Sequence, residues 1–109
     1  MKVVKYNKLV RDKIPEIVKA AGWTPVISVL KKKDFLKVLK AKLVEEAKEL
    51  LAAKSKKDVA HELADLQEVL DTIIAEVGLT KVHVQKIQRE KNKKRGGFKK
   101  RIFLVREEK

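Results

Sequence analysis

Residues 59–77 carry an apolar side chain at every third or fourth position, and this pattern constrains the fold more than any other feature of the chain. With spacings of 4, 3, 4, 3 and 4, the members are Val59, Leu63, Leu66, Leu70, Ile73 and Val77. Such spacing gives an α-helix one apolar face. A similar stripe precedes it and consists of Leu36, Leu39, Leu43, Ala47 and Leu50. Only residues 54–57 separate the two predicted helices, so the pair should form an antiparallel hairpin.

Capping signals predict where these two long helices begin and end. Asp34 is a good N-cap for the first helix, which should end around residues 53–55. The second helix should begin near Asp58 and stop at Gly78.

Two shorter helices are predicted to flank the hairpin. The first should begin near Ile14, with Pro15 in its first turn, and stop at Gly22. The other should be capped by Thr80 and end at Gly96. Residues 23–30 could be an extended segment or a short edge strand, and residues 102–105 suggest a final extended piece.

The predicted fold class is therefore all-α, with an antiparallel helical hairpin as its core and short flanking helices. The 109 residues fit a single domain, residues 1–109. Two long and two short helices do not easily enclose this much apolar surface. We therefore expect a homodimer or homotetramer, in which two hairpins complete a four-helix bundle.

Carboxylates at fixed spacing lie within the two predicted long helices. Glu46 stands three residues before Glu49, and Glu62 stands three residues before Asp65, with Glu45 adjacent. A spacing of three places both members of a pair on one helix face. Folding the hairpin would aim the pairs at one point, where like charges are costly unless a cation lies among them. Oxygen ligands of this kind suit Mg²⁺ or Mn²⁺.

The alternative is that these acids form a solvated face of two amphipathic helices, since Glu is a good helix former. Glu46 argues against it, because this residue falls on the apolar stripe between Leu43 and Leu50. Glu45 and Glu49 also repel each other at a spacing of four.

The net charge of +13 is unevenly distributed along the chain. Residues 1–44 and 78–109 each carry +9, whereas residues 45–77 carry −5. An acidic centre between basic flanks suggests a cation that bridges to a phosphorylated substrate. A basic helical module that binds nucleic acid is the competing hypothesis, although such a module has no use for carboxylates beside its core. Nucleic acid is therefore not the expected partner.

Other patterns narrow the function further. The chain has no Cys, which excludes disulfides and thiolate metal sites. No apolar run approaches the ~20 residues of a membrane span, so a cytoplasmic protein without a membrane partner is expected. His61-Glu62 lacks the second His of a zinc protease motif, because position 65 is Asp. His83 should lie on the surface.

Four further residues have two interpretations each. Gly97, with the preceding Gly96 and a basic run before them, could approach a phosphate, although a helix stop followed by a turn is the favoured interpretation. Trp23 and Phe98 could stack on a base, but single aromatic residues more often belong to a core or an interface.

The acidic pattern resembles that of the MazG-like family, the all-α nucleoside triphosphate pyrophosphohydrolases. The family pattern is two acids, two residues, an acid, a gap, then Glu, two residues and Asp. Residues 6–15, Tyr-Asn-Lys-Leu-Val-Arg-Asp-Lys-Ile-Pro, resemble the opening of its phosphoribosyl-ATP pyrophosphohydrolase-like subgroup. Residues 91–98 provide a third match.

The resemblance implies a site with defined roles. Mg²⁺, or Mn²⁺, would be held by Glu46, Glu49, Glu62 and Asp65. The catalytic carboxylates would be Glu45, Glu46 and Glu49, with Glu45 supporting the ligands or orienting a water. The nucleotide would be bound by Asn7, Lys8, Arg11, Lys91 and Arg95.

The implied reaction is hydrolysis between the α and β phosphates, which releases pyrophosphate and a nucleoside monophosphate. Clearance of non-standard or excess nucleotides is the expected role. Phosphoribosyl-ATP, the histidine-pathway substrate, is the alternative, and the sequence leaves the nucleobase open.

Overall fold

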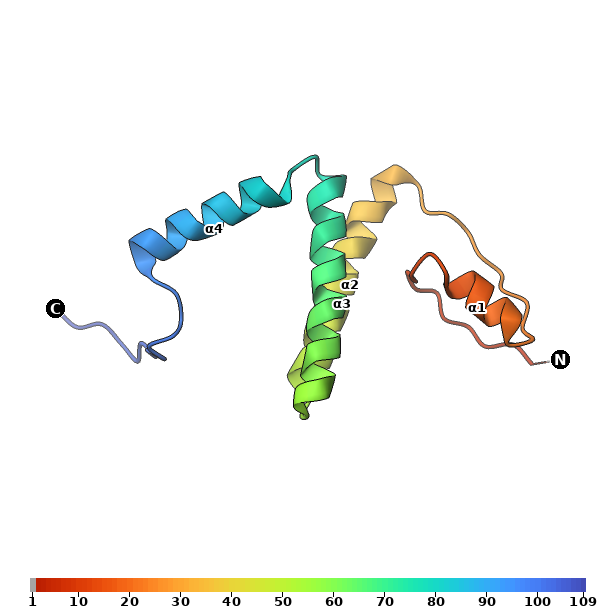
Figure 1. Cartoon of the computed structure of the whole chain (residues 1–109), viewed down its shortest axis with the longest axis horizontal. Coiled ribbons are helices and arrows are strands. Elements are labelled where there is room, and N and C mark those ends of the chain that lie inside the picture. The colour runs from red at the N-terminus through yellow and green to blue at the C-terminus, as the bar shows by residue number, and fades with distance from the viewer. Residues whose placement is uncertain (1) are drawn as a thin grey trace.

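The computed structural model describes residues 2–109 as four α-helices joined by irregular segments (Figure 1). The helices are α1 (Ile14–Ala20), α2 (Lys32–Ala52), α3 (Lys56–Glu76) and α4 (Lys81–Arg95). None of the described residues is in a β-strand. The all-α prediction is therefore confirmed, and residues 23–30 form an extended segment rather than an edge strand.

Helices α2 and α3 form the core of the structure as an antiparallel hairpin (Figure 1). Residues 53–55 link them, and no other pair of helices within residues 2–109 packs extensively. Three side chains in the described part of the chain are buried: Leu39 and Glu46 on α2, and Val69 on α3. The hairpin thus contains every buried residue among residues 2–109, one of which is a carboxylate.

Side-chain caps and glycines set most of the helix ends. The Thr80 hydroxyl accepts a hydrogen bond from the backbone N–H of His83, and Gly96 ends α4 with a positive φ of 80°, as expected. Gly96 and Gly97 thus act as a helix stop. Pro15 lies in the first turn of α1, and Gly22 follows that helix with a positive φ.

One predicted helix start was wrong, and another was two residues from the observed one. The N-cap of α2 is Lys31, whose side chain makes no capping bond, and Asp34 lies inside the first turn. There a negative charge still favours the helix through the N-terminal dipole. Helix α3 starts at Lys56 because Ser55 is its cap, and the Ser55 hydroxyl accepts from the Asp58 backbone N–H at 3.0 Å. Asp58 supplies the capped N–H instead of the capping oxygen.

The apolar stripe of α3 divides into two lines of side chains. Val59, Leu66 and Ile73 are half-buried in the hairpin. Leu63, Leu70 and Val77, each seven residues from the next, are 51%, 41% and 43% exposed. One hairpin therefore covers only part of the apolar surface that the sequence provides.

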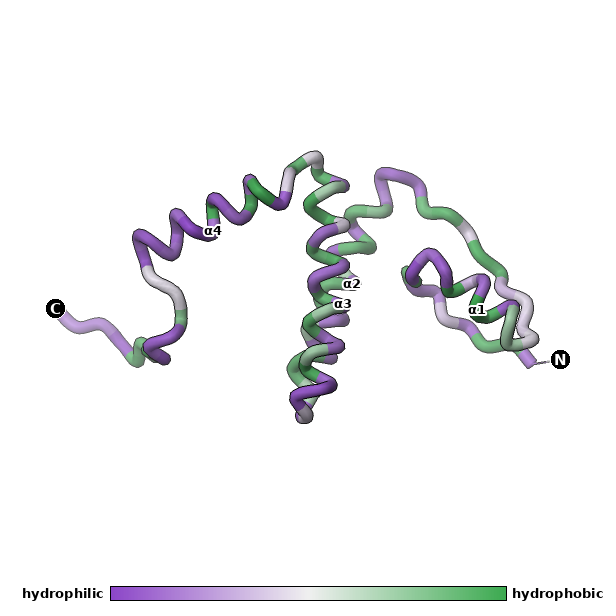
Figure 2. The backbone as a smooth tube through the Cα atoms, viewed as in Figure 1, coloured by the Kyte–Doolittle hydropathy of each residue, from purple (hydrophilic) through white to green (hydrophobic). Residues whose placement is uncertain are grey.

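Two arms extend from the hairpin: the N-terminal arm, residues 2–31, and the C-terminal arm, residues 77–109 (Figure 1). The radius of gyration is 18.8 Å, and the dimensions are 67 × 34 × 26 Å. A compact chain of this length has a radius of gyration of about 13 Å. Helix α4 is mostly hydrophilic (Figure 2) and points away from the hairpin. No described helix is long and apolar enough to cross a membrane.

Candidate metal centre

Helix α2 contributes three carboxylates to one cluster. Carboxylate oxygens of Glu45, Glu46 and Glu49 lie within 4.8 Å of one another. Glu46 and Glu49 are three residues apart and Glu45 and Glu49 are four apart, so Glu49 neighbours both of the others on the helix surface. The predicted clustering on α2 is therefore present in the fold.

Helix α3 adds two carboxylates from the opposite side of the hairpin. Glu46, Glu62 and Asp65 also offer oxygens within 4.8 Å of one another. Glu46 belongs to both groups and joins them across the hairpin. The five acids, 20 residues apart at most in sequence, thus form one continuous cluster. We define the carboxylate cluster as Glu45, Glu46, Glu49, Glu62 and Asp65.

The interior of the carboxylate cluster has unsatisfied acceptors. Glu46 is 7% exposed, and one of its carboxylate oxygens, Oε2, is buried with no hydrogen-bond partner in the described part of the chain. Oε2 of Glu62 is buried and unpaired in the same way. Buried carboxylate oxygens without partners are costly, and native proteins usually satisfy them with a donor, a water or an ion. A divalent cation bound between the two helices fits this donor set, because all the donors are oxygens.

Burial and neighbouring charges raise the pKa of Glu46. Burial of the carboxylate is the largest cause, and the nearby Glu49 carboxylate raises this pKa further. Asp65 acts in the same direction, while the Lys42 ammonium lowers the pKa. The metal-free fold thus resists ionisation at the centre of the cluster. A bound cation would favour the ionised form.

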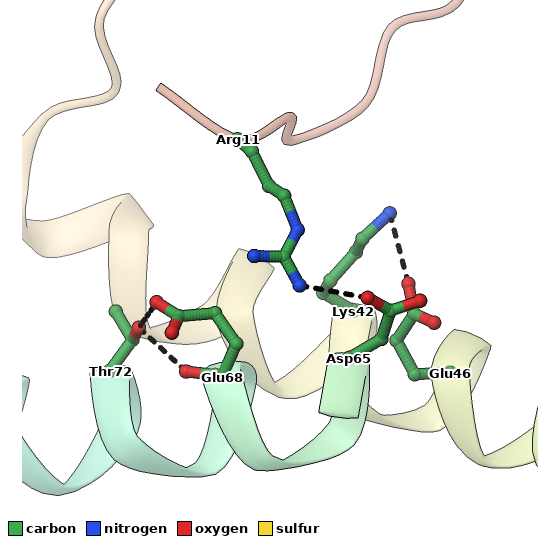
Figure 3. A network of polar contacts seen from close by, with 6 residues as sticks. All are labelled: Arg11, Lys42, Glu46, Asp65, Glu68 and Thr72. Carbon is green, nitrogen blue, oxygen red and sulfur yellow. Dashed lines mark hydrogen bonds and ion pairs between the residues drawn. The ribbon is translucent and has the colours of Figure 1, made fainter. Parts of the chain in front are cut away.

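Two basic side chains of the chain itself contact the acids (Figure 3). Lys42 Nζ lies 3.5 Å from oxygens of both Glu45 and Glu46 on the same helix. Arg11 Nη2 donates to Asp65 Oδ1 at 2.8 Å, across 54 residues of sequence. The sequence reasoning missed Lys42, although its spacing of four from Glu46 was a detectable signal.

One turn further along α3, Thr72 is held by Glu68 (Figure 3). The Thr72 hydroxyl donates to the Glu68 carbonyl oxygen at 2.8 Å. This pair lies outside the carboxylate cluster.

The segment before α1 brings further predicted residues beside the cluster. Asn7, Lys8 and Leu9 line an open pocket together with Lys42 and Glu45 of α2. Asn7 has a φ of 46°, in the left-handed region that Asn tolerates better than most residues. Asn7 therefore suits this turn of the backbone, and its role in binding stays a prediction.

The remaining predicted binding residues lie elsewhere in the chain. Lys91 and Arg95 are on α4, which leads away from the hairpin (Figure 1). Trp23 is 48% exposed and Phe98 is 96% exposed, and both lie in the arms. His83 is exposed, as predicted. One copy of the chain does not bring these residues to the carboxylate cluster.

The fold and this site define a class of protein: a helical hairpin whose facing sides present clustered carboxylates, with basic segments around them. The model of the phosphoribosyl-ATP pyrophosphohydrolase family matches residues 4–95. The chain belongs to this family of pyrophosphohydrolases, which are hydrolases that act on acid anhydrides. The match includes the opening motif, the whole carboxylate cluster and α4.

A protein of Mycolicibacterium smegmatis (strain ATCC 700084 / mc(2)155), described as uncharacterized, is 52% identical over 46 residues. The match covers 42% of the present chain and 47% of that relative. No solved structure matches the chain.

Proposed function

We propose that this protein is a Mg²⁺-dependent nucleoside triphosphate pyrophosphohydrolase. It cleaves between the α and β phosphates and releases a nucleoside monophosphate and pyrophosphate. The observation that carries the proposal is the carboxylate cluster, with buried unpaired oxygens on both Glu46 and Glu62. Membership of a pyrophosphohydrolase family supports the same chemistry.

The ligands proposed for Mg²⁺, or for Mn²⁺ in its place, are Glu46, Glu49, Glu62 and Asp65. When bound, a divalent ion neutralises phosphate charge and lowers the pKa of a bound water. Glu46 is central, because its carboxylate belongs both to the α2 group and to the group that includes the α3 acids. Hard oxygen donors on two rigid helices favour ions of this kind over soft metals.

Glu45 and Glu49 are the proposed partners of the attacking water. Glu45 is held by Lys42 at 3.5 Å and lines the open pocket, so its carboxylate faces the side from which a nucleotide can enter. A carboxylate placed there can orient a water and accept its proton.

Basic residues of the N-terminal arm are proposed to bind the phosphates. Lys8 lines the pocket beside Glu45, and Arg11 is at the edge of the cluster on Asp65. Such cations stabilise charge on phosphate oxygens. Asn7 lines the same pocket and is proposed to contact the nucleotide.

Lys91 and Arg95 complete the site only if a second copy supplies them, because α4 leads away from its own hairpin. The exposed line of Leu63, Leu70 and Val77 supports such an assembly. We propose a homodimer or homotetramer in which two hairpins form a four-helix bundle. Sedimentation velocity tests this proposal, and a monomer at micromolar concentration would contradict it.

Clearance of non-standard or excess nucleotides in the cytoplasm is the proposed role. Phosphoribosyl-ATP is a second candidate substrate, because it is the substrate named in the description of the matched family. The two candidates share the metal chemistry and differ in what occupies the nucleoside side of the site.

Product analysis with a panel of nucleoside triphosphates and phosphoribosyl-ATP, with and without Mg²⁺, tests the function. We expect pyrophosphate and a monophosphate, formed only with the metal. Glu49→Gln should abolish turnover and retain the helical circular dichroism spectrum. Glu16→Gln, in an exposed glutamate of α1, is the matched control and should remain active. Full activity of Glu49→Gln would refute the proposal.

A further inference from the structure

The chain places one of its own cations on a proposed metal ligand. The Arg11 guanidinium and the Asp65 carboxylate form a hydrogen-bonded ion pair at 2.8 Å (Figure 3). Asp65 shares the α3 side of the carboxylate cluster with Glu62 and Glu46. Arg11 is thus bound to one of the oxygens that would otherwise be free to bind an ion.

Two other carboxylate oxygens of the cluster differ from Asp65 Oδ1 in having no hydrogen-bond partner among the described residues. Oε2 of Glu46 and Oε2 of Glu62 are buried without a partner, whereas Asp65 has one. A guanidinium on Asp65 occupies a lone pair and adds positive charge beside the cluster. Both effects oppose the entry of a divalent ion. Arg11 and the ion therefore compete for Asp65.

The Arg11 side chain is free to exchange partners while its backbone stays in place. The side chains of Arg11 and Asp65 are 59% and 41% exposed, so water can replace the contact. The Arg11 carbonyl accepts from the Ile14 backbone N–H at 3.0 Å, which anchors the residue at the start of α1. A guanidinium also matches phosphate geometry as well as it matches carboxylate geometry.

We propose that Arg11 is an exchangeable cation of the site, an inference that rests on the metal centre of the proposed function. In the metal-free protein Arg11 pairs with Asp65 and offsets the repulsion among the acids. When a divalent ion binds, Arg11 leaves Asp65 and turns to the phosphates of the ligand. Phosphate binding by Arg11 is thereby coupled to prior loading of the metal.

Mn²⁺ titrations without nucleotide, followed by electron paramagnetic resonance, test the first half of the proposal. Arg11→Gln should bind Mn²⁺ about two- to fivefold more tightly than the unmodified protein, the range of a part-exposed ion pair. Lys13→Gln is the matched control, because it removes one positive charge from the same segment and Lys13 makes no ion pair within residues 2–109. Its Mn²⁺ affinity should change by less than about twofold.

Pyrophosphate binding to the Mg²⁺-loaded protein, measured by calorimetry, tests the second half. Arg11→Gln should weaken this binding by about tenfold or more, because it removes a charge-assisted contact to phosphate. The two effects have opposite signs, whereas a merely structural role for Arg11 would weaken both.

Each other outcome overturns a defined part of the inference. Equal Mn²⁺ affinity in the unmodified protein, Arg11→Gln and Lys13→Gln would reject the competition and leave the metal centre standing. An equal increase in Mn²⁺ affinity in Arg11→Gln and Lys13→Gln would reject the competition, because loss of any nearby positive charge would then explain it. Unchanged pyrophosphate affinity in Arg11→Gln would reject the transfer to phosphate. No Mn²⁺ binding by the unmodified protein would overturn the metal centre and this inference together.

Discussion

The α2–α3 hairpin and the two arms differ in how far they bury their side chains and in the sign of the charge they carry. The hairpin contains all three buried side chains of the described chain and all five acids of the carboxylate cluster. The arms contain no buried residue and most of the excess positive charge. The acidic centre is therefore formed by local packing, and the basic groups reach it only from outside the hairpin.

This difference shows which parts of the structure are determined by packing within one copy of the chain. Two periodic helices with a three-residue link have few ways to pack, so the hairpin determines its own geometry. Helix α4 has a mostly polar surface and packs extensively against no other described helix, its contact with α3 being the ion pair of Lys81 with Asp71 at 3.6 Å, so its position depends on a partner or a ligand. Helices that lack extensive packing, as α4 does, usually have the lowest local stability in a protein.

The largest expected contrast is in core stability. Leu39 is 3% exposed in the hairpin, whereas Val26 is 95% exposed in the N-terminal arm. Leu39→Ala should lower the free energy of unfolding by about 2–5 kcal/mol, because it leaves a cavity between the helices. Val26→Ala should change it by less than about 0.5 kcal/mol. Urea unfolding followed by circular dichroism measures both, and equal losses would contradict the division into hairpin and arms.

The next largest effect concerns the exposed line of α3. Leu70→Glu should weaken the proposed self-association about 30-fold, the size of a central interface residue. Leu51→Glu on α2 is the matched control, because Leu51 is 87% exposed and is outside both apolar stripes. Sedimentation velocity over a concentration series measures the shift. Identical behaviour of both variants and the unmodified protein would exclude this face as the contact.

Much of the hairpin could be predicted because helical spacing is a local rule. The stripe of α3, the burial of Glu46 and the clustering of the acids all follow from a period of 3.6 residues. The starts of α2 and α3 could not be predicted as well. Asp34 and Asp58 are acceptable capping residue types, but α2 begins after Lys31 and α3 after Ser55, because the backbone path decides which residue precedes the first turn.

The contact between Arg11 and Asp65 lay outside the reach of sequence reasoning. The two residues are 54 positions apart, and the segment that carries Arg11 has no periodicity. Its path over the hairpin depends on Asn7 in a left-handed conformation and on the start of α1. The role of Arg11 as a cation was predictable from its type, whereas its partner was not.

The next prediction concerns Glu46, whose effect on stability can be measured separately from its effect on metal binding. The folded protein raises the pKa of Glu46 above its ordinary value of 4.5, so it binds this proton more tightly than the unfolded chain. The contribution of Glu46 to stability therefore falls as the pH rises from the pKa of the unfolded chain through the higher pKa of the folded protein. At pH 7 without metal, Glu46→Gln should raise the free energy of unfolding, because a neutral amide removes the cost of ionising a buried carboxylate.

Thermal unfolding at pH 4 and pH 7, with and without Mn²⁺, checks this expectation. The gain from Glu46→Gln should be smaller at pH 4 than at pH 7, because the raised pKa leaves more of the native carboxyl protonated at the lower pH. Mn²⁺ should stabilise the unmodified protein and Glu16→Gln but not Glu46→Gln. A loss of stability in metal-free Glu46→Gln at pH 7 would show that the Lys42 ion pair outweighs the cost of burial.

The smallest effect compares two equivalent caps, one in each region. Ser55 caps α3 in the hairpin and Thr80 caps α4 in the C-terminal arm, each by accepting one backbone N–H. Ser55→Ala should lower the free energy of global unfolding by about 1 kcal/mol. Thr80→Ala should leave it unchanged and speed hydrogen exchange only in the first turn of α4, because that helix can fray without opening the hairpin.

Urea unfolding and amide hydrogen exchange on both variants decide between two views of α4. An unchanged unfolding midpoint in Thr80→Ala means that α4 is independent of the hairpin, as its lack of packing indicates. An equal loss in both variants means that α4 unfolds together with the hairpin. In that case α4 must be packed against a second copy, because its own hairpin offers it no extensive contact. The same result would favour delivery of Lys91 and Arg95 to a neighbouring carboxylate cluster.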